Sequence, residues 1–282
     1  QRADRPVRLD HLGRPWAALE RFDLIITTPQ YRLPPRGHIV VCRLPLHGGT
    51  PLVLAEARRR WQATLGELPR PRLAVLVGGN SGPYSLYPQT AQGLVQGALA
   101  WAKERGGALM LTTSPRTPPK ASTALAATLA ASGVPYVHYG AAERQRGEPN
   151  PYMGFLASAE AILVTGESAS MLAEAAATGR PVYIFDLKRA AQGLPLWRRK
   201  GGLRSQVVGY HLARRFGPRR MVRDVEILHR HLLAEGNVLY WEDAQTAKGI
   251  ANGCPTSALD TDPGGQEDLA RACRAVRALV TS

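Results

Sequence analysis

Three short stretches of this sequence place glycine, hydroxyl and charged side chains in orders that suit the binding of a phosphate-bearing ligand. In the first, residues 78–82 (GGNSG), two glycines let the backbone approach an anion and a serine adds a hydroxyl donor. The stretch is neither the Gly-x-Gly-x-x-Gly of dinucleotide-binding folds nor a Walker loop, because no Gly-Lys-Ser/Thr follows. We predict a phosphate-contacting turn, with a plain strand-to-helix turn as the alternative. The residues assigned to it are Gly78, Gly79, Asn80 and Ser81.

The second stretch, residues 112–118 (TTSPRTP), surrounds one arginine with hydroxyl groups and holds it between prolines. Ser114 and Thr117 lie on either side of Arg116, whose guanidinium can bind two phosphate oxygens through parallel N–H bonds. The pattern favours a phosphate cradle. The alternative is a surface turn with a solvated arginine.

The third stretch, residues 164–171 (VTGESASM), has the order of a strand end, a tight turn and a helix start. Ser168 is the predicted N-cap, so the free amides of the first helical turn would point at a ligand. Ser170 and Glu174 are four residues apart and share one helix face, where the carboxylate is placed to accept the hydroxyls of a ribose. The alternative is an ordinary capped helix with an exposed glutamate.

The same stretch almost spells Gly-x-Ser-x-Gly, the nucleophile elbow of serine hydrolases. Its last position is Ser170 instead of the glycine that permits close packing at that strained turn. A general base would have to come from His211, His229 or His231, and nothing in the sequence places any of them near the serine. A serine hydrolase is therefore a less favoured alternative.

Composition narrows the class of protein. The 282 residues carry 36 Lys and Arg against 22 Asp and Glu, a net charge of +14, and 44% are hydrophobic, which is enough for a folded core. The sequence contains no apolar run of about 18 residues, the length of a membrane span, and we identify no secretory signal near its start. Three scattered cysteines predict neither a disulfide framework nor a zinc site, so we expect a reducing, cytoplasmic compartment and no metal.

The positive charge is concentrated between residues 188 and 230, which hold twelve basic and two acidic residues and carry +10 of the net charge. Such a field attracts polyanions, and an anionic membrane surface or a phosphorylated sugar is the expected partner. Nucleic acid is disfavoured because no RNP, zinc-finger or basic-zipper pattern is present. The alternative is a solvated, arginine-rich surface. The basic residues are Lys188, Arg189, Arg198, Arg199, Lys200, Arg204, Arg214, Arg215, Arg219, Arg220, Arg223 and Arg230.

An alternation of apolar runs and helical patterns must position the three loops. Runs that are apolar throughout predict a parallel sheet covered by helices on both faces, an α/β, Rossmann-like fold. Because ligands bind beyond the carboxyl ends of parallel strands, we expect the three loops at one edge of that sheet. Strands are expected at 73–77, 108–112, 134–139, 162–165 and 182–185, and helices at 89–104, 119–132, from 151, at 168–178, 225–234 and 266–280.

The chain before this alternation is short. Apolar runs at 22–27 and 38–42 predict two strands, and Thr50 followed by Pro51 predicts the start of a helix that continues to about residue 66. The expected organisation is an N-terminal α/β lobe at 1–67, a Rossmann-like domain at 68–251, and a Gly/Pro/Asp-rich connector with a C-terminal helix at 252–282.

Taken together and in order, these motifs resemble the mitochondrial fission "elongated mitochondria" family and its bacterial relatives, described as GT-B-type glycosyltransferases. The second motif departs from the family pattern, because Arg116 stands alone where the family tends to have two arginines. The matching stretches are VLVGGNS at 75–81, TSPRTP at 113–118, NPY at 150–152, VTGESASM at 164–171 and TGRPV at 178–182.

The resemblance implies a GT-B-type donor domain joined to a partial acceptor-type lobe, and a glycosyltransferase that uses a nucleotide sugar without a metal or cofactor. It implies a cell-envelope glycolipid or lipopolysaccharide-type glycan as acceptor. The expected location is the cytoplasm, with peripheral attachment to the inner membrane as part of that expectation. The eukaryotic relatives suggest the alternative of a non-catalytic membrane-surface adapter. No catalytic base is assigned. The donor-binding residues selected are Gly78, Gly79, Asn80, Ser81, Ser114, Arg116, Thr117, Asn150, Glu167, Ser168, Ser170, Met171 and Glu174.

Overall fold

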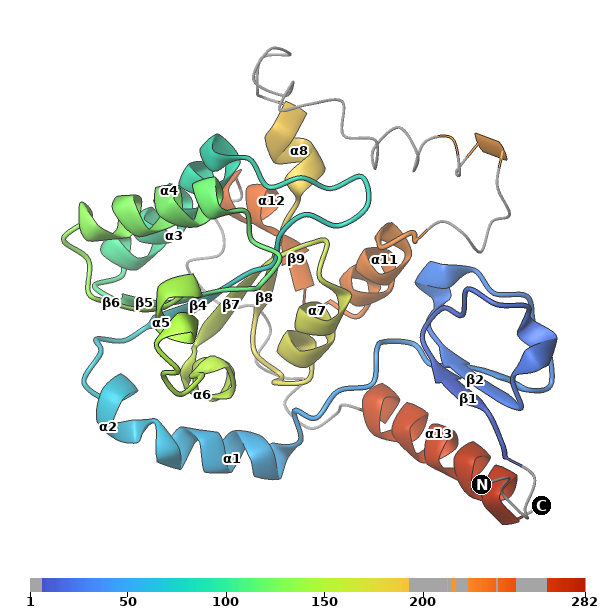
Figure 1. Cartoon of the computed structure of the whole chain (residues 1–282). Coiled ribbons are helices and arrows are strands. Elements are labelled where there is room, and N and C mark those ends of the chain that lie inside the picture. Colours follow the sequence, from blue (N-terminus) through green and yellow to red (C-terminus); the bar gives the residue numbers. More distant parts are fainter. Residues whose placement is uncertain are drawn as a thin grey trace.

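The computed structural model describes residues 7–192, 212, 215–216, 223–236, 238–246 and 263–281. Seven of the twelve basic residues between 188 and 230 lie outside these ranges, as do His211 and Cys254. The described chain forms one large and one small parallel sheet, which lie side by side (Figure 1).

The large sheet is parallel throughout, as the sequence predicts. Its strand order is β6-β5-β4-β7-β8-β9. This is the order of doubly wound folds, and the chain reverses its direction of travel across the sheet between β4 and β7. The strands are β4 (Arg72–Val77), β5 (Ala108–Thr113), β6 (Tyr136–Tyr139), β7 (Ala161–Thr165), β8 (Val182–Phe185) and β9 (Val238–Tyr240).

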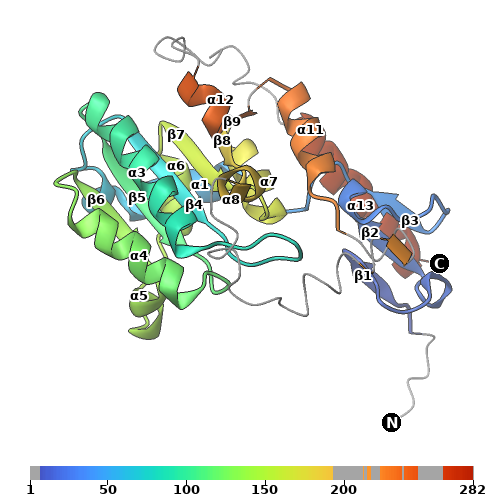
Figure 2. The same cartoon turned by 90° about the horizontal axis from the view of Figure 1, so that it is seen from above.

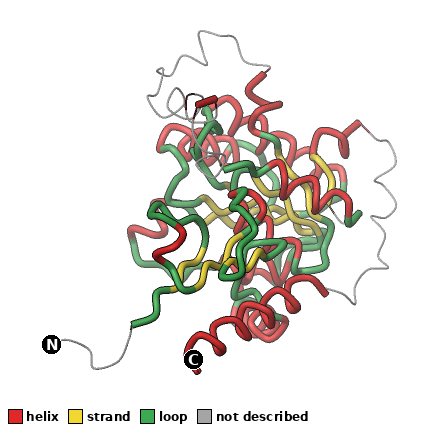
Figure 3. Tube along the Cα trace, turned by 90° about the vertical axis from the view of Figure 1, so that its right-hand side faces the viewer, coloured by secondary structure: helices red, strands yellow, loops and turns green. Residues whose placement is uncertain are grey.

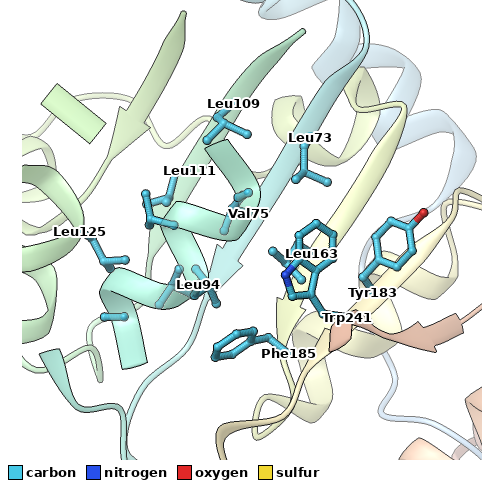
Figure 4. Packing of buried hydrophobic residues seen from close by; sticks show 14 of the residues in the cluster. Leu73, Val75, Leu94, Leu109, Leu111, Leu125, Leu163, Tyr183, Phe185 and Trp241 are labelled. Carbon is cyan, nitrogen blue, oxygen red and sulfur yellow. The ribbon is translucent and has the colours of Figure 1, made fainter. Parts of the chain in front are cut away.

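Helices cover both faces of the large sheet, because successive residues of its central strands point to opposite sides. In β4, Leu73 and Val75 face one hydrophobic cluster and Ala74 and Leu76 face the other. Figure 4 shows Leu94 and Leu125 of the first helical layer packed over Leu111 and Val75. The first layer contains α3 (Pro88–Glu104), α4 (Pro119–Ala130), α8 (Leu187–Gln192) and α12 (Trp241–Thr246). The second contains α6 (Tyr152–Ser158), α7 (Ala169–Ala176) and α11 (Glu226–Ala234).

The small sheet consists of three parallel strands in the order β1-β2-β3, with the short helices η1 (Leu19–Arg21) and η2 (Pro29–Tyr31) in its connections. Its face is covered by α13 (Pro263–Thr281), which returns from the far end of the sequence (Figure 2). Ala272 of α13 is buried in one cluster with Leu24, Ile26 and Cys42. The strands are β1 (Asp10–Leu12), β2 (Leu24–Thr27) and β3 (Ile39–Val41).

Two helices, α1 (Pro51–Arg60) and α2 (Gln62–Leu65), lie between the sheets in sequence and pack on the large one. Thr50 caps α1, since its Oγ1 accepts a hydrogen bond from the Val53 amide at 3.3 Å. Arg58 Nε donates to the Ala157 carbonyl at 2.9 Å, which ties α1 to α6. The viewpoint of Figure 3 shows the helices arranged around the strands of both sheets.

The structure differs from the predicted elements where local signals are weak. The helix expected from 51 to 66 is interrupted at Trp61, and the strand expected from 134 begins at Tyr136. Two three-residue strands, β1 and β9, have no apolar run long enough to reveal them, and each forms an outer strand of its sheet. The fifth helix of the chain, α5 (Ala141–Gln145), was also not expected. Among the described helices, none combines the length and hydrophobicity needed to cross a bilayer.

Candidate functional site

The loops that follow β4, β5 and β7 meet at the carboxyl edge of the large sheet. β4 pairs with both β5 and β7, so the three loops are neighbours. Arg116 Nη2 lies 3.5 Å from Ser168 Oγ, and Ser114 Oγ donates to the Gly78 carbonyl at 2.9 Å. The loops therefore meet at the point where the chain reverses across the sheet, which is where ligands bind in open α/β folds.

Gly78 and Gly79 have a role that differs from the one expected from the sequence. The Gly78 amide donates to Thr165 Oγ1 at 2.8 Å, and the Gly79 amide donates to Glu167 Oε1 at 2.6 Å. A side chain on either glycine would collide with Glu167 or with the backbone of Arg116. Both amides are thus used inside the protein, and the glycines allow three loops to pack closely instead of exposing donors to an anion.

The hydroxyls expected to cradle a phosphate also point inward. Thr117 Oγ1 donates to the Gly78 carbonyl and lies 3.3 Å from the Val77 carbonyl, and Ser114 Oγ accepts from the Arg116 amide at 3.2 Å. Asn80 Oδ1 accepts a hydrogen bond from a backbone amide of its own loop at 3.0 Å. Among the polar side chains of the second motif, Arg116 is the exposed one and can contact an anion.

Glu167 is the buried centre of the three loops. It has no exposed surface, and while its Oε1 accepts from Gly79 and contacts Thr165 Oγ1 at 3.3 Å, its Oε2 has no hydrogen-bond partner. Burial raises the pKa of this carboxyl above its ordinary range, opposed by the hydrogen bonds from the Gly79 amide and Thr165 and by the charge of Arg116. Glu167 therefore holds the loops together and does not present its carboxylate to a ligand.

The start of α7 faces the opening between the two sheets. Ser168 occupies the N-cap position, yet its side chain makes no capping hydrogen bond, and its Oγ lies toward Arg116. Ser170, in the first turn, is exposed. The first amides of a helix lack intrahelical acceptors and carry the positive end of its dipole. Together with Arg116 they make this corner favourable for a negatively charged group.

Arg223 is the site residue that sequence reasoning missed, because in sequence it is one of twelve similar basic residues. Its Nε donates to Gln30 Oε1 of the small sheet's η2 at 2.9 Å. On the other side, Nη1 donates to Ser81 Oγ at 3.0 Å and Nη2 to the Glu167 carbonyl at 3.1 Å. Burial lowers the pKa of this guanidinium. A single half-buried cation thus joins the small sheet to two of the three loops.

Two cavities adjoin Arg223 and form the cleft between the sheets. One, of about 530 Å³, is lined on the small-sheet side by His11 and Arg14. The other, of about 210 Å³, lies between Thr27 at the end of β2 and Ser170 at the start of α7. The carboxyl end of β2 therefore faces the same cleft as the loops of the large sheet.

His229 supports the third loop from behind. Its Nε2 lies 2.7 Å from the Gly166 carbonyl, and the Tyr240 hydroxyl lies 3.3 Å from Nδ1. Burial lowers the pKa of His229, which favours a neutral ring that donates from Nε2 to Gly166 and accepts from Tyr240 at Nδ1. His229 thus fixes the turn that positions Ser168.

This arrangement argues against the hydrolase alternative. His229 is buried and both of its ring nitrogens are engaged, His231 is exposed on α11, and His211 lies outside the described residues. No hydrogen bond joins Ser168 to a histidine in the described part of the chain. That part also contains no cluster of three or more His, Cys, Asp or Glu side chains suited to a metal ion.

Three further residues selected from the sequence form a separate group beside α6. The Tyr152 hydroxyl donates to Glu174 Oε2, and Asn150 Oδ1 accepts from the Tyr152 amide at 3.0 Å. Met171 packs with Tyr152 against the second hydrophobic cluster. Burial and the neighbouring Glu174 carboxylate raise the pKa of Tyr152, so its hydroxyl stays protonated. The contact of Glu174 with a ribose remains a prediction.

Comparisons with known proteins agree with the resemblance seen in the sequence. A family model described as Mitochondrial fission ELM1 matches residues 2–217. The Mitochondrial fission protein ELM1 of Arabidopsis thaliana is 30% identical over 204 residues, which make up 64% of this chain and 46% of that protein. The chain therefore spans about half the length of this curated relative. A crystal structure of UDP-GlcNAc 2-epimerase from Neisseria meningitidis bound to UDP-GlcNAc aligns with 76% of this chain and 62% of that chain, at 11% identity and a TM-score of 0.40.

We expect Glu167→Gln to flatten the dependence of stability on pH. Because the pKa of Glu167 is raised above its ordinary value of 4.5, the native state holds this proton more tightly than the unfolded state. Its contribution therefore makes the free energy of unfolding fall as the pH rises above that value. Glutamine keeps an acceptor for the Gly79 amide and cannot ionise. Urea unfolding at several pH values between about 4 and 8 measures the slope.

The matched control is Glu56→Gln, which changes an exposed glutamate on α1. It should retain the wild-type slope. Identical slopes for wild type and Glu167→Gln would show that the buried carboxyl does not shift its pKa on folding.

Proposed function

On the premise that this chain belongs to the mitochondrial fission ELM1 family, we propose that it is a GT-B-type glycosyltransferase that binds a nucleotide sugar in the cleft between its two sheets. The observation that carries the proposal is the meeting of Arg116, Arg223 and the start of α7 at the reversal point of the large sheet. Open α/β sheets bind their ligands at this point, and a diphosphate is the part of a nucleotide sugar that such groups favour.

In the proposed reaction these groups act on the leaving diphosphate. Negative charge develops on the diphosphate as its bond to the sugar breaks, and the Arg116 guanidinium with the α7 amides would stabilise that charge without a metal. Arg223, fixed by Gln30 and Ser81, adds a positive field that needs no rearrangement during the reaction. Across the cleft, His11 lines the cavity of about 530 Å³ and supplies an imidazole, a common general base, on the side proposed for the acceptor.

The first test is nucleotide binding. Thermal shift with UDP-, GDP-, ADP- and CMP-sugars should raise the melting temperature for one class of base. For that ligand, Arg116→Gln should weaken binding about tenfold in calorimetry, because a charge-assisted contact with phosphate is lost. Binding of the corresponding nucleoside, which lacks phosphate, should not change.

Arg59→Gln is the control for this substitution, since Arg59 is an exposed arginine on α1. It should bind the nucleotide sugar as wild type does. The proposed role of Arg116 is refuted if both variants bind alike, and the proposed function is refuted if no nucleotide sugar binds.

The second test concerns the ribose. Glu174→Gln should weaken nucleotide binding by about 1–3 kcal/mol, the range for losing a hydrogen bond to a charged group. The matched control is Tyr152→Phe, which removes the hydroxyl that Glu174 accepts from and leaves the carboxylate in place. It should keep nucleotide affinity. Equal losses of affinity in the two variants would mean that Glu174 acts through Tyr152 and does not touch the ribose.

A second candidate function is a non-catalytic adapter at a membrane surface. The Arabidopsis relative is named a mitochondrial fission protein, and this name and the charge of +10 between residues 188 and 230 favour the adapter. We propose that this segment binds anionic lipid. If the protein is a glycosyltransferase, the same segment would bind its glycolipid acceptor. Each basic residue near an anionic surface contributes about 1 kcal/mol.

Vesicle sedimentation tests the membrane contact. Binding should increase with the anionic lipid fraction and fall steeply with salt, because exposed charges are screened within about 8 Å at physiological ionic strength. Replacing Arg198, Arg199 and Lys200 by Glu should abolish most of the binding. Wild-type protein that stays in solution with strongly anionic vesicles at low salt would contradict the proposal, as would a triple variant that sediments equally well.

A further inference from the structure

A third cavity, larger than both cavities of the cleft, lies on the other side of the segment that joins the small sheet to α1. Its volume is about 690 Å³, within the range of small-molecule sites. Its walls come from residues 43–51, from the second half of α7, from the end of α11 with the start of β9, and from α13 between Gly265 and Arg277. In Figure 1, α13 lies along the small sheet, next to the chain that leads into α1.

The walls of this cavity are largely apolar. Leu269 of α13 is 41% exposed, although the neighbouring Ala272 is buried against the small sheet. An apolar side chain that lines an open cavity gains stability when an apolar ligand covers it. The apolar lining residues are Leu44, Pro45, Leu46, Ala173, Ala176, Ala177, Leu232, Val238 and Leu269.

The charged groups at the rim leave an excess of positive charge. Both acidic side chains of the lining are already paired. Glu235 accepts from Arg43 at 2.6 Å, and Asp268 accepts from the Arg43 amide and from Arg271. The two basic residues that line the cavity further along α13 are not paired in this way.

Arg274 and Arg277 line the cavity from α13, and both are exposed. Within the part of the chain that the structure describes, neither forms an ion pair. They stand three residues apart, on neighbouring turns of one helix face, so both can contact one anionic group.

We infer that this cavity binds one molecule of a single-chain anionic amphiphile, with its hydrocarbon chain along the apolar walls and its carboxylate or phosphate at Arg274 and Arg277. The walls come from several separate segments and enclose the cavity. Such a cavity fits one amphiphile molecule, whereas a flat bilayer surface could not enter it. The site is independent of the proposed glycosyltransferase function, although Pro45 and Leu46 line both this cavity and the smaller cavity of the cleft.

The test uses the full chain and a fluorescent fatty-acid probe, dansyl-undecanoate, below its critical micelle concentration. Emission should shift to the blue and saturate at one probe per protein, and dodecanoate should displace the probe better than dodecanol. The double variant Arg274→Gln/Arg277→Gln should weaken probe binding about tenfold, equivalent to about 1.4 kcal/mol. It should also remove the preference for the carboxylate over the alcohol.

A second pair of variants tests the apolar part. Ala177→Phe places a ring in the cavity and should abolish binding. Leu269→Gln, an exposed change that leaves the fold intact, should weaken it. The controls lie on α1, where Arg59→Gln and Leu52→Gln change exposed residues that do not line the cavity and should bind as wild type.

Cys273 provides a readout that needs no substitution, because it is an exposed free thiol that lines the cavity. Dodecanoate should slow its alkylation, followed by peptide mass mapping. The inference is overturned if probe binding does not saturate, or if neither the arginine pair nor Ala177→Phe changes it. Nucleotide binding in the cleft should survive all of these variants. A failure of the proposed nucleotide-sugar function and a failure of this inference are therefore separate results.

Discussion

The half-buried guanidinium of Arg223 is the contact on which the arrangement around the cleft depends. A charge removed from water is tolerated only when its donors are satisfied. Here the acceptors come from Gln30 on the small sheet and from Ser81 and Glu167 on the large one. Separating the sheets would take the Gln30 acceptor away from this guanidinium, so this one residue couples the position of the small sheet to the geometry of the loops.

The loops themselves are held by hydrogen bonds that point inward. Glu167 Oε1, the Thr165 hydroxyl and two glycine amides are hydrogen-bonded to one another beneath the surface. The consequence for binding is that backbone amides after β4 are not free for a ligand. In the proposed function, affinity for an anion would rest instead on the Arg116 side chain and on the first turn of α7.

The segment after β3 connects two places where ligands could bind. Pro45 and Leu46 form part of the wall of the cleft's smaller cavity and part of the wall of the cavity under α13. The same segment leads into α1, which Arg58 ties to α6 of the large sheet. The two cavities therefore share part of one wall, and that wall belongs to the segment that joins the sheets.

The sequence by itself determined the parallel sheet, its helical layers and the meeting of three loops at one edge. Continuous apolar runs mark strands that are covered on both faces, and loops that follow parallel strands must emerge at the same edge. It also determined the family. Only the tertiary structure decided what the residues do there. Gly78 and Gly79 proved to serve loop packing, and Glu174 proved to pair with Tyr152. Arg223 emerged as the link between the sheets, since its partners lie up to 193 residues away in sequence and no local pattern records contacts of that range.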